Sequence, residues 1–140
     1  MISGGQAQGF TPVAFTPDST SIAASASSPN QTTLWRISDG VVRMRFPGAA
    51  PEEGVTAIRF TPDGVRMVTT GYLPWVDAEG LWQQSGVIRF WRVADGVLRK
   101  TYDKRTDLGV TSPVAWSPDA SRFAYGTYNG TAVVAKTPAP

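Results

Sequence analysis

Short runs of alternating apolar and polar residues cover most of the chain, and Pro-Asp or Asp-Gly pairs separate many of them. An alternation with a period of two is typical of a strand with one buried face, whereas both dipeptides favour tight turns. The pattern therefore predicts an all-β chain of short strands joined by turns.

One phrase occurs three times: an alternating run that ends in an aromatic residue, followed by Thr or Ser and then by Pro-Asp. Residues of high β-propensity at every second place predict a strand, and Pro with Asp behind it predicts the turn that follows. The aromatic residues of the three copies are Phe15, Phe60 and Trp116, at spacings of 45 and 56 residues. This recurrence predicts three structural repeats.

A second phrase, Trp-Arg-x-x-Asp-Gly, occurs in the first two repeats at residues 35–40 and 91–96. An Asp-Gly turn between two alternating runs predicts a hairpin. Other strands are expected at residues 21–25, 41–46, 66–70, 97–102, 122–127 and 132–135. The first two repeats are therefore predicted to be four-stranded meanders and the third to supply three strands, which makes eleven strands in all.

The repeats resemble the WD-repeat family from Pro12 to Lys136, in their Ser/Thr-Pro-Asp turns, in the turn at residues 129–131 and in the strands that end in Leu/Phe-Trp-Arg. The chain departs from the family pattern because Arg36 and Arg92 replace the Asp that gives the family its name, Ala135 replaces the third Trp, and His is absent. The resemblance implies divergent β-propeller blades, each a four-stranded antiparallel meander.

The resemblance also implies that residues 1–140 form one propeller arc of about three blades. We expect an N-terminal segment over 1–11, blade 1 over 12–54, blade 2 over 55–110, and blade 3 over 111–140 without its outer strand. An arc of three blades is not a closed ring, because propellers have about four to eight blades. Either the chain is part of a larger propeller, which the differences between the repeats favour, or copies assemble into an oligomeric ring.

Blade 2 carries an insertion of 11 residues relative to blade 1, within residues 72–85, which we expect to form a loop. By family topology this loop shares one face of the propeller with the connections between blades. We predict that this face binds a protein partner, because aromatic residues with a mixed-charge rim are typical of recognition sites. The predicted face consists of Tyr72, Trp75, Asp77, Glu79, Trp82, Glu52, Glu53, Lys104, Arg105 and Asp107.

Two alternatives to this binding face remain open. The two Trp side chains could fold back and cover their own blade, which explains the presence of two large apolar side chains as well as partner binding does. A sugar-binding role would need carboxylate or amide partners that the sequence does not place. Trp35 and Trp91, by contrast, are expected to pack between blades, as are Phe15, Phe60 and Trp116.

The composition excludes several classes of chemistry. Without His and Cys there is no triad of nucleophile, His and carboxylate, no thiolate metal site and no disulfide. The repeated aspartates occupy equivalent turn positions, which indicates turn formation, and the neighbouring pair Glu52 and Glu53 offers too few ligands for a metal ion. We therefore expect no catalytic residue, no cofactor and no metal.

The net charge and the hydropathy of the chain indicate whether nucleic acid or a membrane is a partner. A net charge of +2, from 13 Lys and Arg against 11 Asp and Glu, is too weak to indicate nucleic acid or an anionic membrane surface. No run approaches the roughly 18 apolar residues of a membrane span, and the first residues lack a secretory pattern. We expect a soluble chain without nucleic-acid or membrane partners; its compartment is not determined, with the cytoplasm slightly favoured.

The resulting functional prediction is a noncatalytic protein-protein interaction scaffold of WD-repeat type, within a larger propeller or an oligomeric ring. The alternative is an accessory propeller domain of a larger enzyme, since propellers also serve in such proteins. The residues on either side of this segment would discriminate the two.

Overall fold

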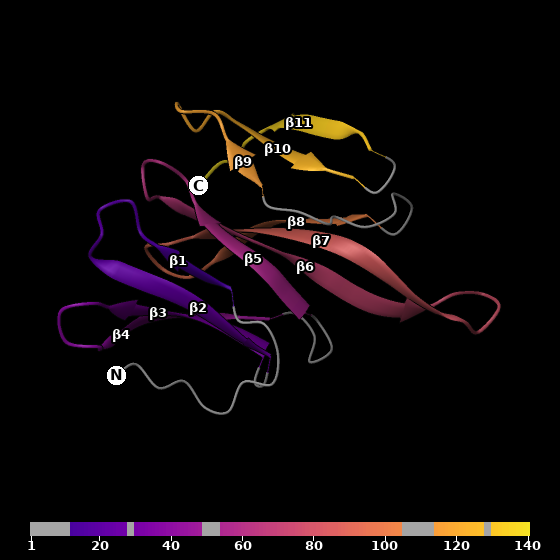
Figure 1. Cartoon of the computed structure of the whole chain (residues 1–140), viewed down its shortest axis with the longest axis horizontal. Coiled ribbons are helices and arrows are strands. Elements are labelled where there is room, and N and C mark those ends of the chain that lie inside the picture. The colour runs from indigo at the N-terminus through magenta and orange to yellow at the C-terminus, as the bar shows by residue number, and fades with distance from the viewer. Residues whose placement is uncertain (1–11, 28–29, 49–53, 105–113, 128–129) are drawn as a thin grey trace.

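A computed structural model describes residues 12–27, 30–48, 54–104, 114–127 and 130–140. These residues form eleven strands in three antiparallel sheets of four, four and three strands. The second sheet lies between the first and the third, and the arc is open (Figure 1). The predicted all-β class and the strand count are confirmed. No helix long and apolar enough to cross a membrane occurs among the described residues.

Each sheet follows the order of its strands along the chain, as expected of a meander. The first sheet contains β1 (Val13–Phe15), β2 (Ser21–Ser27), β3 (Asn30–Arg36) and β4 (Val42–Pro47). The second contains β5 (Gly54–Phe60), β6 (Arg66–Val76), β7 (Trp82–Arg92) and β8 (Leu98–Lys104). The third contains β9 (Ala115–Trp116), β10 (Arg122–Gly126) and β11 (Ala132–Lys136).

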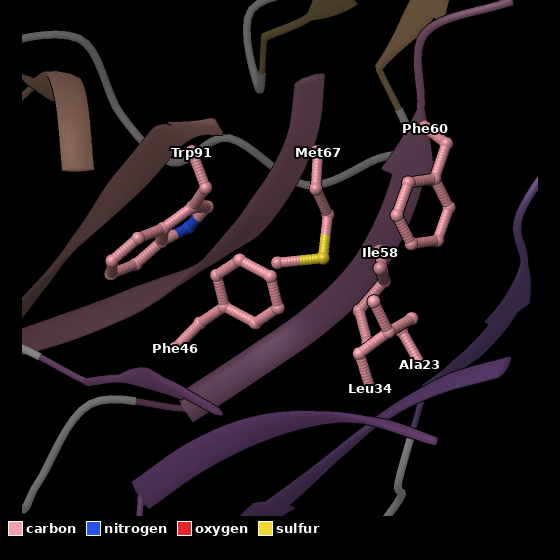
Figure 2. Close-up of a cluster of buried hydrophobic side chains, with 7 residues drawn as sticks. All are labelled: Ala23, Leu34, Phe46, Ile58, Phe60, Met67 and Trp91. Carbon is pink, nitrogen blue, oxygen red and sulfur yellow. The ribbon is translucent and has the colours of Figure 1, made fainter. Parts of the chain in front are cut away.

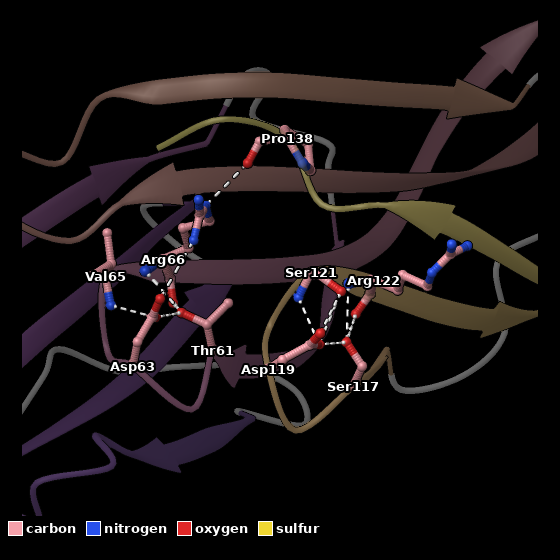
Figure 3. A network of polar contacts seen from close by, with 9 residues as sticks. All are labelled: Thr61, Asp63, Val65, Arg66, Ser117, Asp119, Ser121, Arg122 and Pro138. Carbon is pink, nitrogen blue, oxygen red and sulfur yellow. Dashed lines mark hydrogen bonds and ion pairs between the residues drawn. The ribbon is translucent and has the colours of Figure 1, made fainter.

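The Ser/Thr-Pro-Asp phrase forms the turn between the first two strands of every sheet, as Figure 3 shows for two of the three copies. In the third sheet the Ser117 hydroxyl donates a hydrogen bond of 2.5 Å to the Asp119 carboxylate, and the Ser121 amide donates one of 3.0 Å. These bonds lower the pKa of Asp119 to about 2, the Ser117 hydroxyl most of all. The aspartates therefore act as turn formers, as their repeated position predicts.

Equivalent residues of the three sheets align in rows across the strands, because directly paired residues of antiparallel strands point to the same face. We call the first set the aromatic rows: Phe15–Ile22–Trp35, Phe60–Met67–Trp91 and Trp116–Phe123–Ala135. The neighbouring residues on these strands point to the other face of each sheet. We call them the opposite rows: Ala14–Ala23–Leu34, Arg59–Val68–Phe90 and Ala115–Ala124–Val134.

The core between the first two sheets joins an aromatic row to an opposite row. Phe60, Met67 and Trp91 of the second sheet are buried against Ala23 and Leu34 of the first, as Figure 2 shows. Phe46 closes this cluster and packs edge-on against Trp91, with ring centroids 5.8 Å apart. At this junction the aromatic row of the second sheet therefore packs against Ala23, Leu34 and Phe46 of the first.

The core between the second and third sheets repeats the arrangement. Phe90 of the second sheet's opposite row contacts two rings of the third sheet's aromatic row, with centroids 4.8 Å from Phe123 and 5.8 Å from Trp116. Val68, Phe90 and Phe123 are almost completely buried. The two junctions thus use the same faces in the same order.

The expectation that Phe15 packs between blades is wrong in this chain. Phe15 is 65% exposed, whereas its equivalent Phe60 is 9% exposed. Trp35 is half-buried, whereas its equivalent Trp91 is buried. The reason is tertiary: no described residue covers the aromatic row of the first sheet, so the same sequence pattern is buried in one repeat and open in another.

Candidate functional site

The insertion in the second repeat is a strand extension and not the expected loop. At the row Gly54–Tyr72–Gly86–Lys104 the second sheet is still four strands wide. Beyond this row β6 and β7 pair with each other for four more pairs, from Leu73 with Ser85 to Val76 with Trp82, and no other strand among the described residues pairs with them there. The two strands project past the edge of the molecule (right in Figure 1). We call residues 73–85 the projecting hairpin.

Asp77 builds the turn at the tip of the projecting hairpin. Its carboxylate accepts hydrogen bonds from the amides of Glu79 and Leu81, at 3.1 and 2.8 Å, and from the Gln83 side chain at 2.8 Å. These bonds, led by the one from Leu81, lower the pKa of Asp77. Gly80 has a φ of 80°, which few other residues adopt without strain. The Asp77 carboxylate therefore forms the turn, and its part in the predicted binding face stays a prediction.

The two Trp residues of the hairpin point to opposite faces. Trp82 pairs with Val76, and the next pair along the ribbon joins Trp75 to Gln83. Successive pairs alternate between faces, so Val76 and Trp82 share one face while Trp75 lies on the other. Trp82 is 76% exposed and Trp75 is half-buried. A loop packed over its own blade would have buried both indoles.

The face that carries Trp82, which we call the Trp82 face, is apolar. It contains Tyr72, Pro74, Val76, Trp82 and Gln84. Among these side chains Tyr72 and Val76 are exposed, as is Leu81 in the turn beside them. Tyr72 lies directly over Gly54, where a Cβ atom would come within 2.2 Å of the ring. Gly54 therefore permits the Tyr72 ring to lie flat at the base of the hairpin.

The remaining residues of the predicted face are placed only in part. Lys104 ends β8 in the base row beside Gly86, so the end of β8 adjoins the hairpin. Glu79 is exposed at the tip. Glu52, Glu53, Arg105 and Asp107 lie outside the described residues.

The sequence reasoning missed two contributors to this apolar surface, Val76 and Leu81. The signal was present, because Asp77 and Gly80 are spaced as in a tight turn. A turn at that place pairs Val76 with Trp82 and extends both strands. The expected loop over residues 72–85 leaves this alternation out, because it treats the insertion within the second repeat as irregular.

A concavity lies at the other ends of the strands, between the first two sheets. It has a volume of about 520 Å³, and its lining includes Pro17, Asp18, Arg43, Met44 and Asp63. The carboxylates of Asp18 and Asp63 accept hydrogen bonds within their own turns, which lower both pKa values. Within the described parts of the chain, no group of three or more acidic, His or Cys side chains could hold a metal ion.

Comparison with known proteins connects this architecture to one family. No family model matches the chain. A WD repeat-containing protein WDS homolog from Arabidopsis thaliana is 28% identical over 105 residues, which is 74% of this chain and 18% of the relative. The chain is similar to WD-repeat propellers, as a divergent and partial match.

Solved propellers show the same fold. The β-propeller domain of Myceliophteria thermophila Cps50 (Swd1) superposes with a TM-score of 0.63 at 14% identity, over 89% of this chain and 35% of that one. Kluyveromyces lactis Hsv2 superposes with a TM-score of 0.52 at 20% identity, over 84% of this chain and 34% of that one. The chain thus spans about a fifth of the curated relative and about a third of each of these propellers.

The departures from the WD-repeat pattern are compensated locally. Arg36 and Arg92 stand where the family has Asp, and each forms an ion pair with the Asp of its own Asp-Gly turn, Asp39 and Asp95. In the second sheet the buried Trp91 indole donates a hydrogen bond of 3.0 Å to the Thr69 hydroxyl. Each of the two Asp-Gly turns therefore carries its own ion pair.

Proposed function

We propose that this chain is a noncatalytic interaction scaffold that binds a protein partner through the Trp82 face of the projecting hairpin. The observation that carries the proposal is the exposed indole of Trp82 on a ribbon that extends beyond the body of the sheet. The likeness to WD-repeat propellers supports a scaffold role, since such propellers commonly serve as interaction platforms.

The energetics of the hairpin favour recognition over self-packing. A two-stranded ribbon is marginally stable on its own. A ribbon without a binding partner is therefore expected to pack its large apolar side chains against its own blade. Here Tyr72, Val76 and Trp82 stay exposed on one face. Trp and Tyr are also the residues that most often dominate binding energy at protein interfaces. The Trp82 face thus has the composition of an interface centre.

The noncatalytic part of the proposal rests on the acid-base groups. The chain has no His and no Cys. Turn hydrogen bonds lower the pKa values of Asp18, Asp39, Asp63, Asp95 and Asp119. A carboxyl group with a lowered pKa is a poor general acid at neutral pH. An accessory domain of a larger enzyme, the alternative role, would use the same hairpin for the same purpose.

The test compares three forms of the full chain as immobilised bait: wild type, Trp82→Ser and Ile37→Ser. The probe is a total protein extract of the source organism, and each protein that the wild type retains is identified, purified and titrated by calorimetry. We expect a protein that binds the wild type and Ile37→Ser alike. Its Kd for Trp82→Ser should be weaker by roughly thirty-fold or more, as for a central interface Trp.

Ile37→Ser is the matched control because Ile37 is an exposed apolar residue at the opposite ends of the strands. Thermal melts of both variants must match the wild type, which separates binding from folding. If Trp82→Ser retains the same proteins with unchanged affinity, or if the wild type retains none, the proposal is wrong.

A further inference from the structure

The hydrogen bonds at the tip of the projecting hairpin fix the direction in which each amide of β7 points. The Asp77 amide donates to the Leu81 carbonyl at 3.0 Å, so this pair bonds directly across the turn. Bonded and non-bonded pairs alternate along an antiparallel ladder. Gln83 therefore bonds to its partner on β6, whereas the backbone groups of Trp82 and Gln84 point away from β6, to the side on which β8 lies.

The other end of β7 has the same phase. The Arg92 amide donates to the Val97 carbonyl at 2.9 Å, on the β8 side. Every second residue of β7 thus faces β8, and the last of them that pairs with β8 is Gly86. The same edge continues to Gln84 and Trp82, where no strand of the described residues pairs with it. This part of the edge therefore presents two amides and two carbonyls.

The two edges of the projecting hairpin differ in chemistry. On β6 the outward-pointing residues are Pro74 and Val76, which pair with Gln84 and Trp82. Proline has no amide hydrogen, so the β6 edge has one outward donor where the β7 edge has two. Natural sheets use Pro and charged side chains to protect an edge from added strands. Residues 82–85 of the β7 edge include neither, so this edge is the one suited to accept a strand.

The regular outer strands of the first two sheets are protected in the usual way. β4 carries Arg43 and Arg45, and β8 carries Arg99, Lys100 and Lys104. Charged side chains on an edge strand oppose pairing with another chain. The uncharged β7 edge of the hairpin is therefore a local departure from the rest of the molecule.

We infer that the partner binds as an extended segment that adds an antiparallel strand to the β7 edge at Trp82 and Gln84, in line with β8. Each of these two residues exchanges backbone hydrogen bonds with one residue of the added strand. The side chains of those two partner residues lie on the Trp82 face, because directly paired residues point to the same face. The segment therefore carries apolar side chains at alternate positions, packed on the Trp82 indole. This inference rests on the proposed function and specifies the class of partner.

The probe is a display library of random nine-residue peptides, selected on the immobilised full chain. We expect enriched sequences with apolar residues at every second position. One enriched peptide is synthesised and titrated by calorimetry against wild type, Gln84→Pro and Gln84→Thr. Gln84→Pro removes one outward amide and should weaken binding by roughly ten-fold or more, whereas Gln84→Thr keeps that amide and should bind like the wild type.

Gln84→Pro is expected to fold, because Pro74, its direct partner in the ribbon, already occupies the corresponding outward position on β6. Thermal melts check this expectation. A second measurement leaves the protein unchanged and methylates backbone nitrogens of the peptide. Methyl groups on the alternate residues that face β7 should abolish binding, whereas methyl groups on the intervening residues should not.

Hydrogen exchange, followed by NMR, identifies the amides that the peptide covers. Binding should slow the exchange of the Trp82 and Gln84 amides by about ten-fold or more. The Gln83 amide is the internal control, because it already bonds within the hairpin and should change little.

The outcomes separate this inference from the proposed function. If Trp82→Ser loses the peptide while Gln84→Pro and both methylation patterns retain it, the added strand is wrong and the Trp82 face still binds. If the library yields no binder, or binders without the alternation, or a peptide that Trp82→Ser binds as well as the wild type, the inference is overturned.

Discussion

The indole of Trp91 donates a hydrogen bond of 3.0 Å to the hydroxyl of Thr69, in the buried centre of the second sheet. Trp91 pairs directly with Met67, and Thr69 is two residues further along the same strand, so the bond runs diagonally between β6 and β7. It satisfies the one polar atom of a side chain that otherwise packs on Phe46. In the first sheet Ala24 holds the position of Thr69, so this bond belongs to the second sheet alone.

Replacing Thr69 by Val should therefore lower the free energy of unfolding by about 1–3 kcal/mol, because the buried indole N–H would lose its acceptor while the volume stays similar. Urea unfolding of the full chain measures the change. The control is Ala24→Val at the equivalent position of the first sheet, where no such bond exists to be lost. Equal effects at the two positions would contradict the assigned role of the bond.

Phe90 and Trp82 lie on the same strand and should respond to truncation in opposite ways. Phe90 is buried among Tyr102, Trp116 and Phe123, and Phe90→Ala should lower the free energy of unfolding by about 3–5 kcal/mol. Trp82→Ser should change it by no more than about 0.5 kcal/mol, because the indole is solvent-exposed. Chemical denaturation distinguishes these outcomes. A large loss in Trp82→Ser would mean that the indole covers its own blade.

The Ser/Thr-Pro-Asp turns require a left-handed residue at one position, where Ser19, Gly64 and Ala120 have φ values of 58°, 71° and 56°. Only Gly64 adopts this conformation without a Cβ penalty. Gly64→Ala should thus lower the free energy of unfolding by about 1–2 kcal/mol. The added Cβ would meet Pro17 at 3.8 Å, an ordinary contact, so the change reports on the backbone.

Gly126→Ala is the matched control for this prediction. Gly126 lies in β10 at a negative φ, and its Cβ would meet nothing within 4 Å. The substitution restricts the unfolded chain and should stabilise the protein by about 0.4–1 kcal/mol. Thermal melts of the two variants should shift in opposite directions, and a shared direction would count against the strain argument.

The low pKa of Asp119 makes its turn sensitive to acid. The pKa of Asp119 is about 2 in the folded chain, against an ordinary value of 3.8. At a pH near these values the Asp119 carboxyl group therefore binds fewer protons in the folded chain than in the unfolded chain. Its contribution to stability is present above the ordinary pKa and is lost as the pH falls toward the folded value. A carboxyl titration by NMR should show a midpoint of about 2 for Asp119.

Ser117→Ala should raise that midpoint toward 3.8, because the Ser117 hydroxyl is the largest cause of the shift. Ser38→Ala, in a different turn, should leave it unchanged. A wild-type midpoint at 3.8 would show that the hydrogen bonds of this turn are not formed in solution.

Much of the candidate site was readable from the sequence, but its geometry was not. The insertion, its two Trp residues and its position beside the ends of β5 and β8 follow from repeat spacing and strand order. The division of Trp75 and Trp82 between two faces depends on the register of β6 with β7, which a shift of one residue would reverse. The tight turn at Asp77 sets that register.

Most strands, the repeated turns and the repeat itself follow from the sequence, because they depend on local chemistry: alternation along a strand, Pro and Asp at fixed turn positions, and Gly after Asp. Tertiary structure alone decided which copy of the pattern is buried. Phe15 and Phe60 have the same place in the same phrase, yet one is exposed and the other is core. Burial is a property of the neighbouring sheet, and no residue pattern within one repeat contains that information.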